Sequence, residues 1–386
     1  MINEYSETKI LSDIIYLDNA ATVQPYQQVL QNFVDTNSST YYNPMASYPQ
    51  AAVVHKAIEQ NKQSIADTLC VDKDTLYFTS GATESNNWAL TKGHKQKQAS
   101  IVTSVAEHES VLTPINQLKN SGSNTIIIPL DSIGRVDLQQ FAQLIANHPI
   151  SLVSVIHVCG QTGAINDIQE IVKLTKKQNP NALVHSDGVQ AFGKIEYNLQ
   201  DLGVDLYTLS LHKLGGLKGL GLLYIKKGIH LAPFLFGGTG GYANRAGTPN
   251  TPAILSSGLA LGLYQSKSYQ EYQQMRQMAI NILQKVDNTK INGNGIPHIL
   301  NVSFEGIKAE VLQNALSDKV IIGIGSACNP KHTQNQVLQS MGLSKQQIQG
   351  SIRISFGPHN TTDQVKKAAE YIATTVNQLR TTSNNQ

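Results

Sequence analysis

The sequence predicts an α/β protein, in which a large domain with a mostly parallel sheet is joined to a smaller α+β domain. The first observation is an alternation, between about residues 75 and 225, of short apolar runs with segments that have helical spacing. The second is that these runs are apolar throughout, which is typical of strands covered by helices on both faces. The third is the length of 386 residues, sufficient for two hydrophobic cores.

The N-terminal part begins the large domain. A short apolar run over residues 14–22 leads into an expected helix over 24–38. Pro44 disfavours a helical conformation at Asn43, so a loop is expected there. A second helix is expected over residues 49–69, where apolar side chains recur at helical spacing.

The middle of the chain carries the sheet. A strand from residue 75 breaks at Gly81, and the chain restarts there as a helix. The other expected strands are 99–104, 125–130, 152–157, 183–186, 206–209 and 221–225, and the expected helices follow His108 and lie near 138–146 and 168–178. Ligands of such sheets bind at the carboxyl ends of the strands.

The C-terminal part forms the smaller domain. The expected helices are 252–265, its polar continuation to about 287, 308–317 and 362–380, and the expected strands are 299–304 and 351–356. We therefore assign residues 14–252 to the large domain, and residues 1–13 with 253–386 to the small domain that carries the Cys328 loop.

Composition favours a globular protein of a reducing compartment. Hydrophobic residues make up 40% of the chain and charged residues 15%, and the net charge is +3 with scattered lysines, so no direct nucleic-acid partner is expected. The three cysteines form neither a CxxC pair nor an even set, which argues against disulfides. No secretory signal and no apolar run of membrane length is visible, so we expect a cytoplasmic protein without a membrane partner.

Lys213 and Asp187 are the first candidate site residues. Lys213 lies between two apolar strands, where desolvation disfavours its charge unless the amine is used, for example to form a Schiff base. Asp187 ends another apolar run. A Schiff-base lysine with an aspartate for a pyridinium nitrogen is the protein-side signature of pyridoxal 5′-phosphate (PLP). Taken alone, the pair also fits a loop aspartate and a lysine that extends to solvent.

The break at Gly81 predicts an anion site. The N–H groups after Gly81 and the Thr83 hydroxyl can bind a phosphate at the start of a helix, although an ordinary cap by Ser80 or Thr83 explains the same residues. The positions that lie just past strand ends, and can therefore converge, are Thr83, His108, His157, Asp187 and Lys213.

Two loops add further candidates. Cys328 follows an apolar strand, among small residues and beside Lys331 and His332, whose charge favours a nucleophilic thiolate. Most cysteines are buried and inert, so Cys328 gains weight from the PLP-type residues elsewhere in the chain. The glycine-rich loop over 237–248 is long for a plain connection, and long loops are often functional.

Several motifs resemble those of one family. They are Tyr16-Leu-Asp-Asn-Ala-Ala-Thr22, Phe78-Thr-Ser-Gly-Ala-Thr-Glu-Ser-Asn86, Glu107-His108, Asp187 to Gln190, Ser210-Leu-His-Lys213, Arg245-Ala-Gly-Thr248, Gly325-Ser-Ala-Cys328 and Ile352-Arg-Ile-Ser-Phe-Gly357. Nearly the whole chain, in order, resembles NifS/IscS-type cysteine desulfurases, which are fold-type I PLP enzymes of the class V aminotransferase group.

The resemblance implies a role for each matching residue. Lys213 is implied as the Schiff-base lysine and proton carrier, His108 as the residue that stacks on the cofactor ring and acts in acid–base steps, and Cys328 as the nucleophile that accepts sulfur. Arg353 and Asn43 are implied to bind the substrate. The cofactor-binding residues implied are Ala82, Thr83, His108, Asp187, Gln190, Ser210, His212, Lys213 and, from the other subunit of a homodimer, Thr248.

The resemblance also implies L-cysteine as substrate and a sulfur-acceptor protein, an iron–sulfur scaffold or a tRNA-thiolation enzyme, as partner; no metal site is implied.

Some positions depart from the family pattern. Cys159 and Gly160 stand where family members commonly have two asparagines, Tyr242 ends an altered glycine segment, and Leu211 replaces a glycine. These changes affect the expected substrate and rate more than PLP binding. Alternatives are an aminotransferase or lyase of the same fold, and a non-catalytic binding protein.

Overall fold

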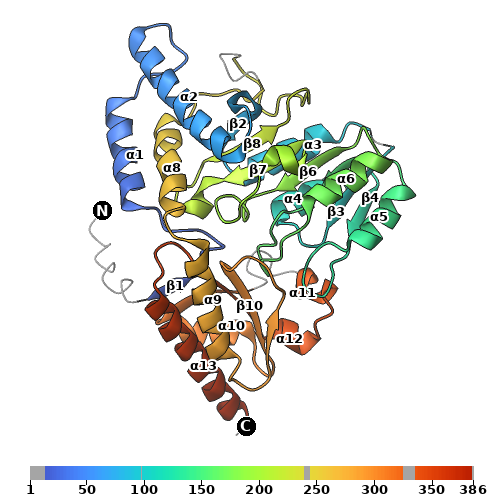
Figure 1. The fold of residues 1–386 in the computed structure, drawn as a ribbon, viewed down its shortest axis with the longest axis vertical. Coiled ribbons are helices and arrows are strands. Elements are labelled where there is room, and N and C mark those ends of the chain that lie inside the picture. The colour runs from blue at the N-terminus through green and yellow to red at the C-terminus, as the bar shows by residue number, and fades with distance from the viewer. Residues whose placement is uncertain (1–13, 97, 239–243, 325–334, 385–386) are drawn as a thin grey trace.

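The computed structural model describes residues 14–96, 98–238, 244–324 and 335–384, which form two sheets with helices around them (Figure 1). The larger sheet and its helices occupy the upper part of the view, and the smaller sheet lies below them. Within these ranges, no helix combines the length and the apolar character needed to cross a bilayer. The Cys328 loop lies outside the described residues.

The larger sheet has seven strands and is parallel except around one strand. In spatial order they are β2 (Leu76–Thr79), β8 (Gly221–Ile225), β7 (Leu206–Ser210), β6 (Leu183–Asp187), β5 (Ile150–Ser154), β3 (Ser100–Ser104) and β4 (Thr125–Ile128). β8 runs antiparallel to both of its neighbours, and the other pairs are parallel. The predicted mostly parallel sheet is confirmed.

Adjacent residues in the central strands point to opposite helical layers, because side chains alternate along a strand. Ile101 and Leu152 belong to a cluster with α3 and α4, whereas their neighbours Val102 and Val153 join the core that includes α5 and α6. The helices of these layers are α3 (Ala82–Gly93), α4 (Glu109–Asn120), α5 (Leu138–Ala146) and α6 (Ile168–Gln178). Burial on both faces explains why these strands are apolar throughout.

Three further helices pack together beside the larger sheet (Figure 1). They are α1 (Gln27–Ser39), α2 (Pro49–Leu69) and α8 (Thr251–Tyr264). Short elements complete this part: η3 (Lys73–Thr75), α7 (Leu199–Leu202) and η4 (Leu211–Leu214). The turn η4 matters for the site, because it follows β7 directly and carries Lys213.

The smaller sheet has five strands and its own core. Its order is β1 (Ile15–Leu17), β11 (Val320–Ile324), β12 (Ser351–Ser355), β10 (Ile299–Phe304) and β9 (Thr289–Asn292). Its helices are α9 (Tyr269–Leu283), α10 (Ala309–Leu316), α11 (Gln336–Ser340), α12 (Lys345–Gln349) and α13 (Thr362–Asn384).

The first strand departs from the domain boundary expected at residue 14. β1 pairs in parallel with β11, and Ile15 and Leu17 are buried in the core of the small sheet. The chain therefore contributes a strand to the small sheet before it enters the large one. Residues 18–23, which follow β1, consequently lie between the two sheets.

Candidate active site

The site forms where the carboxyl ends of β3, β6 and β7 meet. His108 follows β3, Asp187 ends β6, and Ser210 ends β7 just before Lys213. The segment that follows β1 crosses this edge, because Val23 N–H donates to the carbonyl of His212 at 3.1 Å. The predicted convergence at the strand ends is therefore present in the fold.

Asp187 is fixed beneath the site. Its side chain accepts from Asn86 Nδ2 at 2.8 Å and from the N–H of Val189 at 3.0 Å, and the residue is only 3% exposed. Gly188 is required next to it, because a Cβ there would lie 2.0 Å from the ring of Tyr207. Within the described ranges no cation pairs with Asp187, so the carboxylate is available to a positively charged ligand group.

Lys213 is held over the segment that follows β1. Its Nζ donates to the carbonyl oxygens of Ala20 and Ala21, both at 2.7 Å. Gly215 ends the turn in a left-handed conformation (φ 77°), where a Cβ would also meet the ring of Tyr26 at 2.7 Å. The lysine is thus positioned by backbone groups on both sides, which is suitable for an amine that must meet a carbonyl of a ligand.

His108 caps α4 with its ring. Nδ1 accepts from the N–H of Ser110 at 3.1 Å, so in the neutral ring the proton is on Nε2. Although part of the residue faces solvent, desolvation lowers the pKa of His108, and Lys213 adds to this effect while Asp187 opposes it. The ring is therefore neutral near pH 7 and can accept a proton at Nδ1 once the N–H of Ser110 no longer occupies it.

The N-terminus of α3 lacks a side-chain cap. Gly81 is the N-cap residue (φ 153°) and neither Ser80 nor Thr83 accepts a capping hydrogen bond, so the ordinary-cap interpretation does not hold. Instead, Glu84 accepts from the N–H of Ser80 at 2.8 Å. The first N–H groups of α3, at Ala82 and Thr83, can therefore bind an anion.

Ser210 and His212 lie beside that helix end. Ser210 is 2% exposed and is the strand partner of Gly221 on β8. Gly221 in turn packs on the backbone of Gly81, because a Cβ on Gly221 would lie 2.6 Å from the carbonyl carbon of Gly81. His212 Nδ1 is 3.1 Å from Thr22 Oγ1, and burial, with nearby lysines, lowers the pKa of His212 to about 3. His212 therefore interacts as a neutral hydrogen-bonding group.

Gln190 bridges two parts of the site. Its Nε2 donates to the carbonyl of Ala20 at 2.8 Å, and its Oε1 accepts from Lys194 Nζ at 2.6 Å. Lys194 is not among the site residues predicted from the sequence. The signal was present, because a lysine in an apolar stretch four residues after Gln190 lies on the same side of a helical turn.

Arg353 reaches the site from β12 of the small sheet. Its Nη2 donates to Asp18 Oδ1 at 2.8 Å, and its Nη1 donates to the carbonyl of Gly160 at 2.9 Å. Asp18 belongs to the motif Tyr16-Leu-Asp-Asn-Ala-Ala-Thr22, and no role was predicted for it from the sequence. The guanidinium thus links both sheets, and its planar fork is suited to a carboxylate.

Two predicted residues, Asn43 and Thr248, are exposed on loops. Asn43 is exposed, and its Oδ1 accepts from the N–H of Met45 in the loop before α2. The 21-residue α2 spans about 30 Å at 1.5 Å per residue, and only its distant end, Leu69, lies near Lys194. The loop of Asn43 precedes the opposite end of α2 from the one that lines the cavity of Lys194.

Thr248 is exposed on a loop held by an ion pair between Arg245 and Glu84, with Nε–Oε1 at 2.8 Å.

His157, in contrast, is a core residue: its Nδ1 contacts Tyr207 OH at 2.7 Å, and burial lowers the pKa of His157 to about 4. Cys328, Lys331, His332 and Tyr242 lie outside the part of the chain that the structure describes.

Comparison with known proteins agrees with this geometry. The model of the family "Aminotransferase class-V" matches residues 15–368. The chain belongs to the class-V aminotransferase family. The cysteine desulfurase IscS of Methanosarcina thermophila is 33% identical over 381 residues, which cover 96% of this chain and 93% of that protein. Within the family, the chain therefore groups with the IscS-type desulfurases, and the resemblance inferred from the motifs is confirmed.

Solved structures give the same result for the fold. A NifS-like protein superposes with a TM-score of 0.88 at 29% identity, covering 95% of this chain and 100% of its own. The structure titled "SspA in complex with cysteine" has a TM-score of 0.79 at 28% identity and covers 90% of this chain and 100% of its own. The predicted fold-type I architecture is confirmed.

Proteins of the class-V aminotransferase family depend on PLP, and the residues of this site fit that group. The buried Asp187 has no cationic partner in the described ranges and suits a protonated ring nitrogen. The uncapped start of α3 suits a phosphate, and Lys213 suits an aldehyde carbon. The aspartate, the helix end and the lysine belong to one edge of one sheet, which is where a single ligand can contact all three.

Proposed function

We propose that this family member is a cysteine desulfurase, which converts L-cysteine to L-alanine and transfers the sulfur to Cys328. The observation that carries the proposal is the meeting of Asp187, Lys213 and the uncapped start of α3 at one sheet edge. Asp187 and Lys213 would hold PLP, with the phosphate at Ala82 and Thr83. The chemistry that PLP supplies when bound is withdrawal of electron density from the α-carbon of an amino acid.

The residues of the chain divide the remaining work. Arg353 pairs with the substrate carboxylate and orients the amino acid, Lys213 carries a proton to and from the α-carbon, and neutral His108 accepts a proton at a ring nitrogen. Ser210 and His212 extend the phosphate site, and Gln190 bonds the ring oxygen of PLP.

Sulfur transfer is assigned to Cys328. Its thiolate attacks the sulfur of the substrate, so that an S–S bond forms while the C–S bond breaks. The electron pair of the broken bond stays with carbon, which takes a proton and leaves as part of alanine. The enzyme then holds a persulfide, whose outer sulfur passes to an acceptor protein of iron–sulfur assembly or tRNA thiolation.

We further propose a homodimer with shared sites, in the cytoplasm. Asn43 and Thr248 are both exposed on loops, where they can face a partner. Large aromatic side chains are exposed on the same loops, Tyr41 at 72% and Phe236 at 82%, which favours a covering surface. Fully active protein that sediments as a monomer would contradict this arrangement.

A second candidate is an aminotransferase or lyase of the same fold that acts on a related amino acid. Gly160 favours it, because this position lacks the amide side chain that members of the resembling family commonly have there. Packing does not require the glycine, since a Cβ would make only ordinary contacts, 3.7 Å from Gln190 Cγ, beside the carbonyl that Arg353 contacts.

Product analysis separates the two candidates. Purified protein is reconstituted with PLP and given L-cysteine and a reductant, and alanine and sulfide are quantified against time. Equal amounts of alanine and sulfide support the desulfurase. Pyruvate, or a keto acid formed with an amino-group acceptor, would assign the second candidate instead.

A further inference from the structure

Lys194 is a buried lysine that the proposed reaction does not use. It lies four residues after Gln190, is 6% exposed, and donates through Nζ to Gln190 Oε1 at 2.6 Å. In the described part of the chain no carboxylate pairs with it. Removing an ammonium from water without a counter-ion is unfavourable, so the position needs a reason beyond packing.

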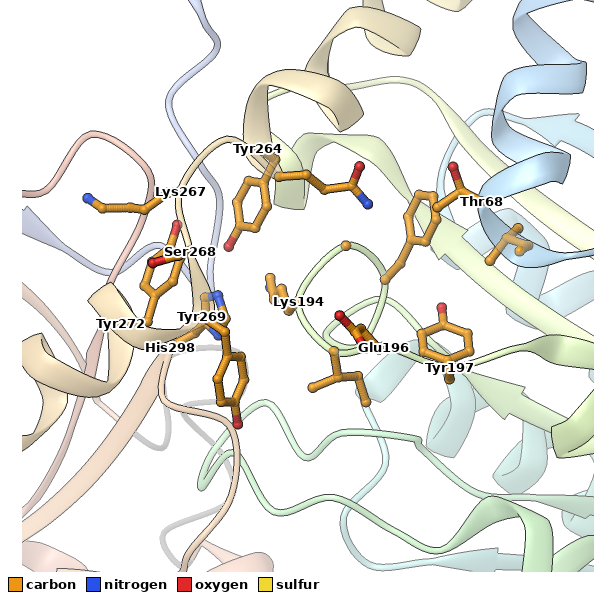
Figure 2. Close-up of a pocket in the computed structure, with 15 residues that line it drawn as sticks. Thr68, Lys194, Glu196, Tyr197, Tyr264, Lys267, Ser268, Tyr269, Tyr272 and His298 are labelled. Carbon is orange, nitrogen blue, oxygen red and sulfur yellow. The ribbon is translucent and has the colours of Figure 1, made fainter.

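Lys194 also lines a cavity of about 790 Å³ (Figure 2). Tyr264 and Tyr272 from α8 and α9, and His298 before β10, line this cavity with Lys194. Lys194 therefore has the cavity on one side and Gln190 of the candidate active site on the other. The cavity gives the buried amine a route for water and for proton exchange.

The hydrogen bonds of Gln190 fix the direction of its amide. A charged lysine can only donate, so it requires Oε1 on its side, and the carbonyl of Ala20 can only accept, so it requires Nε2. Nε2 carries two hydrogens, of which one goes to Ala20 at 2.8 Å. The second is left for an acceptor on the ligand side.

We propose that Lys194 is a positioning residue, which locks the amide of Gln190 so that its N–H faces the ring oxygen of PLP. The inference rests on the proposed PLP-dependent function and adds a residue to its cofactor site. Without the ammonium, Oε1 loses its partner, and the amide can rotate so that an acceptor, not a donor, faces the ring oxygen.

The lock depends on the charge of Lys194. Burial, and then the charges of Lys213 and Arg353, lower the pKa of Lys194 to about 7. A neutral amine can donate to Oε1 or accept from Nε2 and so tolerates either amide orientation, and the lock weakens as the pH rises through that value. The two histidines that face Lys194 do not obscure this change, because the pKa of His212 is lowered to about 3 and that of His298 well below its usual value.

The test is a double-mutant cycle on PLP binding to apoprotein, followed by visible absorbance. Lys194→Met and Gln190→Met should each weaken binding by about five- to ten-fold, the effect of one lost hydrogen bond, and shift the absorbance band in the same direction. The double variant should be no weaker than Gln190→Met alone, because Lys194 acts through Gln190. Asp201→Asn, an exposed change outside the lining of the cavity, should leave both readouts at wild-type values.

A second measurement does not depend on Lys194→Met folding. The absorbance band of the wild type should change with a midpoint near pH 7, and Lys194→Arg, which stays charged and has room in the cavity, should remove that change. Additive losses in the cycle, or a band in Lys194→Arg that titrates as in the wild type, would overturn the inference. Wild-type protein that binds no PLP would overturn the proposed function itself.

Discussion

The two sheets contribute different parts of the site. The large sheet presents Asp187, Lys213 and His108 at strand ends, each held by hydrogen bonds to nearby backbone or side-chain groups. The small sheet presents Arg353 from the middle of β12, and Cys328 lies four residues after β11. The residues proposed to hold the cofactor thus lie at strand ends of the large sheet, whereas the arginine proposed to bind the substrate carboxylate belongs to the small sheet. Substitutions in the two sheets should therefore separate cofactor binding from sulfur transfer.

Lys213→Ala should give the largest effect. Removing the amine removes both the covalent link to PLP and the proton carrier, so the yellow colour should be lost and turnover should fall by at least about 10³-fold. Absorbance spectra and alanine release measure these changes. Lys218→Ala, an exposed lysine of the same loop, is the control. A colourless wild type that PLP cannot reconstitute would remove the PLP assignment.

Cys328→Ser should abolish sulfide and alanine release while the protein stays yellow. The reason is that a serine hydroxyl is not ionised near pH 7 and cannot accept sulfur. Cys159→Ser is the matched control, because Cys159 is 1% exposed inside the apolar core and cannot approach a substrate. It should cost stability, about 1 kcal/mol for a buried hydroxyl, and leave turnover. Normal turnover in Cys328→Ser would disprove the desulfurase mechanism.

Arg353→Lys should have a smaller and more selective effect. A lysine keeps the charge but cannot form two parallel hydrogen bonds to a carboxylate, so we expect kcat/KM to fall by about 10- to 100-fold. The affinity for PLP should stay unchanged, because Arg353 belongs to the small sheet. Steady-state kinetics and a PLP titration of the same sample test both halves. A coupled loss of PLP would show that the two sheets do not divide the work as described.

The smallest effect concerns stability and separates core histidines from His108. Burial lowers the pKa of His157 to about 4 and that of His185 to about 3, below the unfolded value of about 6.5. The unfolded chain therefore binds more protons, and the free energy of unfolding should fall as the pH decreases from about 6.5 to 4. We expect on the order of 2 kcal/mol per histidine, measured by urea unfolding. His185→Gln should make the slope shallower, and an unchanged slope would contradict the assignment.

The sequence predicted the regular elements well where their signal is local. The helices over 138–146 and 168–178 and the strand over 221–225 agree with the structure residue for residue. The destination of β1 was missed, because three apolar residues fit a strand of either sheet, and only the pairing with β11 decides. The short α7 and β9 carried too few residues for a periodic pattern.

The sequence predicted the site residues at the strand ends, but not the residues that hold other site residues in place through hydrogen bonds. Asp187 and Lys213 could be found because charged groups at the ends of apolar runs are conspicuous. The role of Asp18 depends on a partner 335 residues away, which no local pattern reports, whereas that of Lys194 depends on Gln190, four residues before it. His157 was expected to face the site, but its position three residues past β5 turns the ring to Tyr207.

The contact between Arg353 and Asp18 has a consequence for selectivity against stray anions. Asp18 is an internal carboxylate that is present at a fixed position, so a chloride ion or an arbitrary organic acid gains little by approaching an arginine whose charge is already partly balanced. An amino acid that is held at the same time through its amino group overcomes this competitor, because its carboxylate arrives at high effective concentration. In the proposed function, Asp18 would thus favour those carboxylates that are attached to an amine.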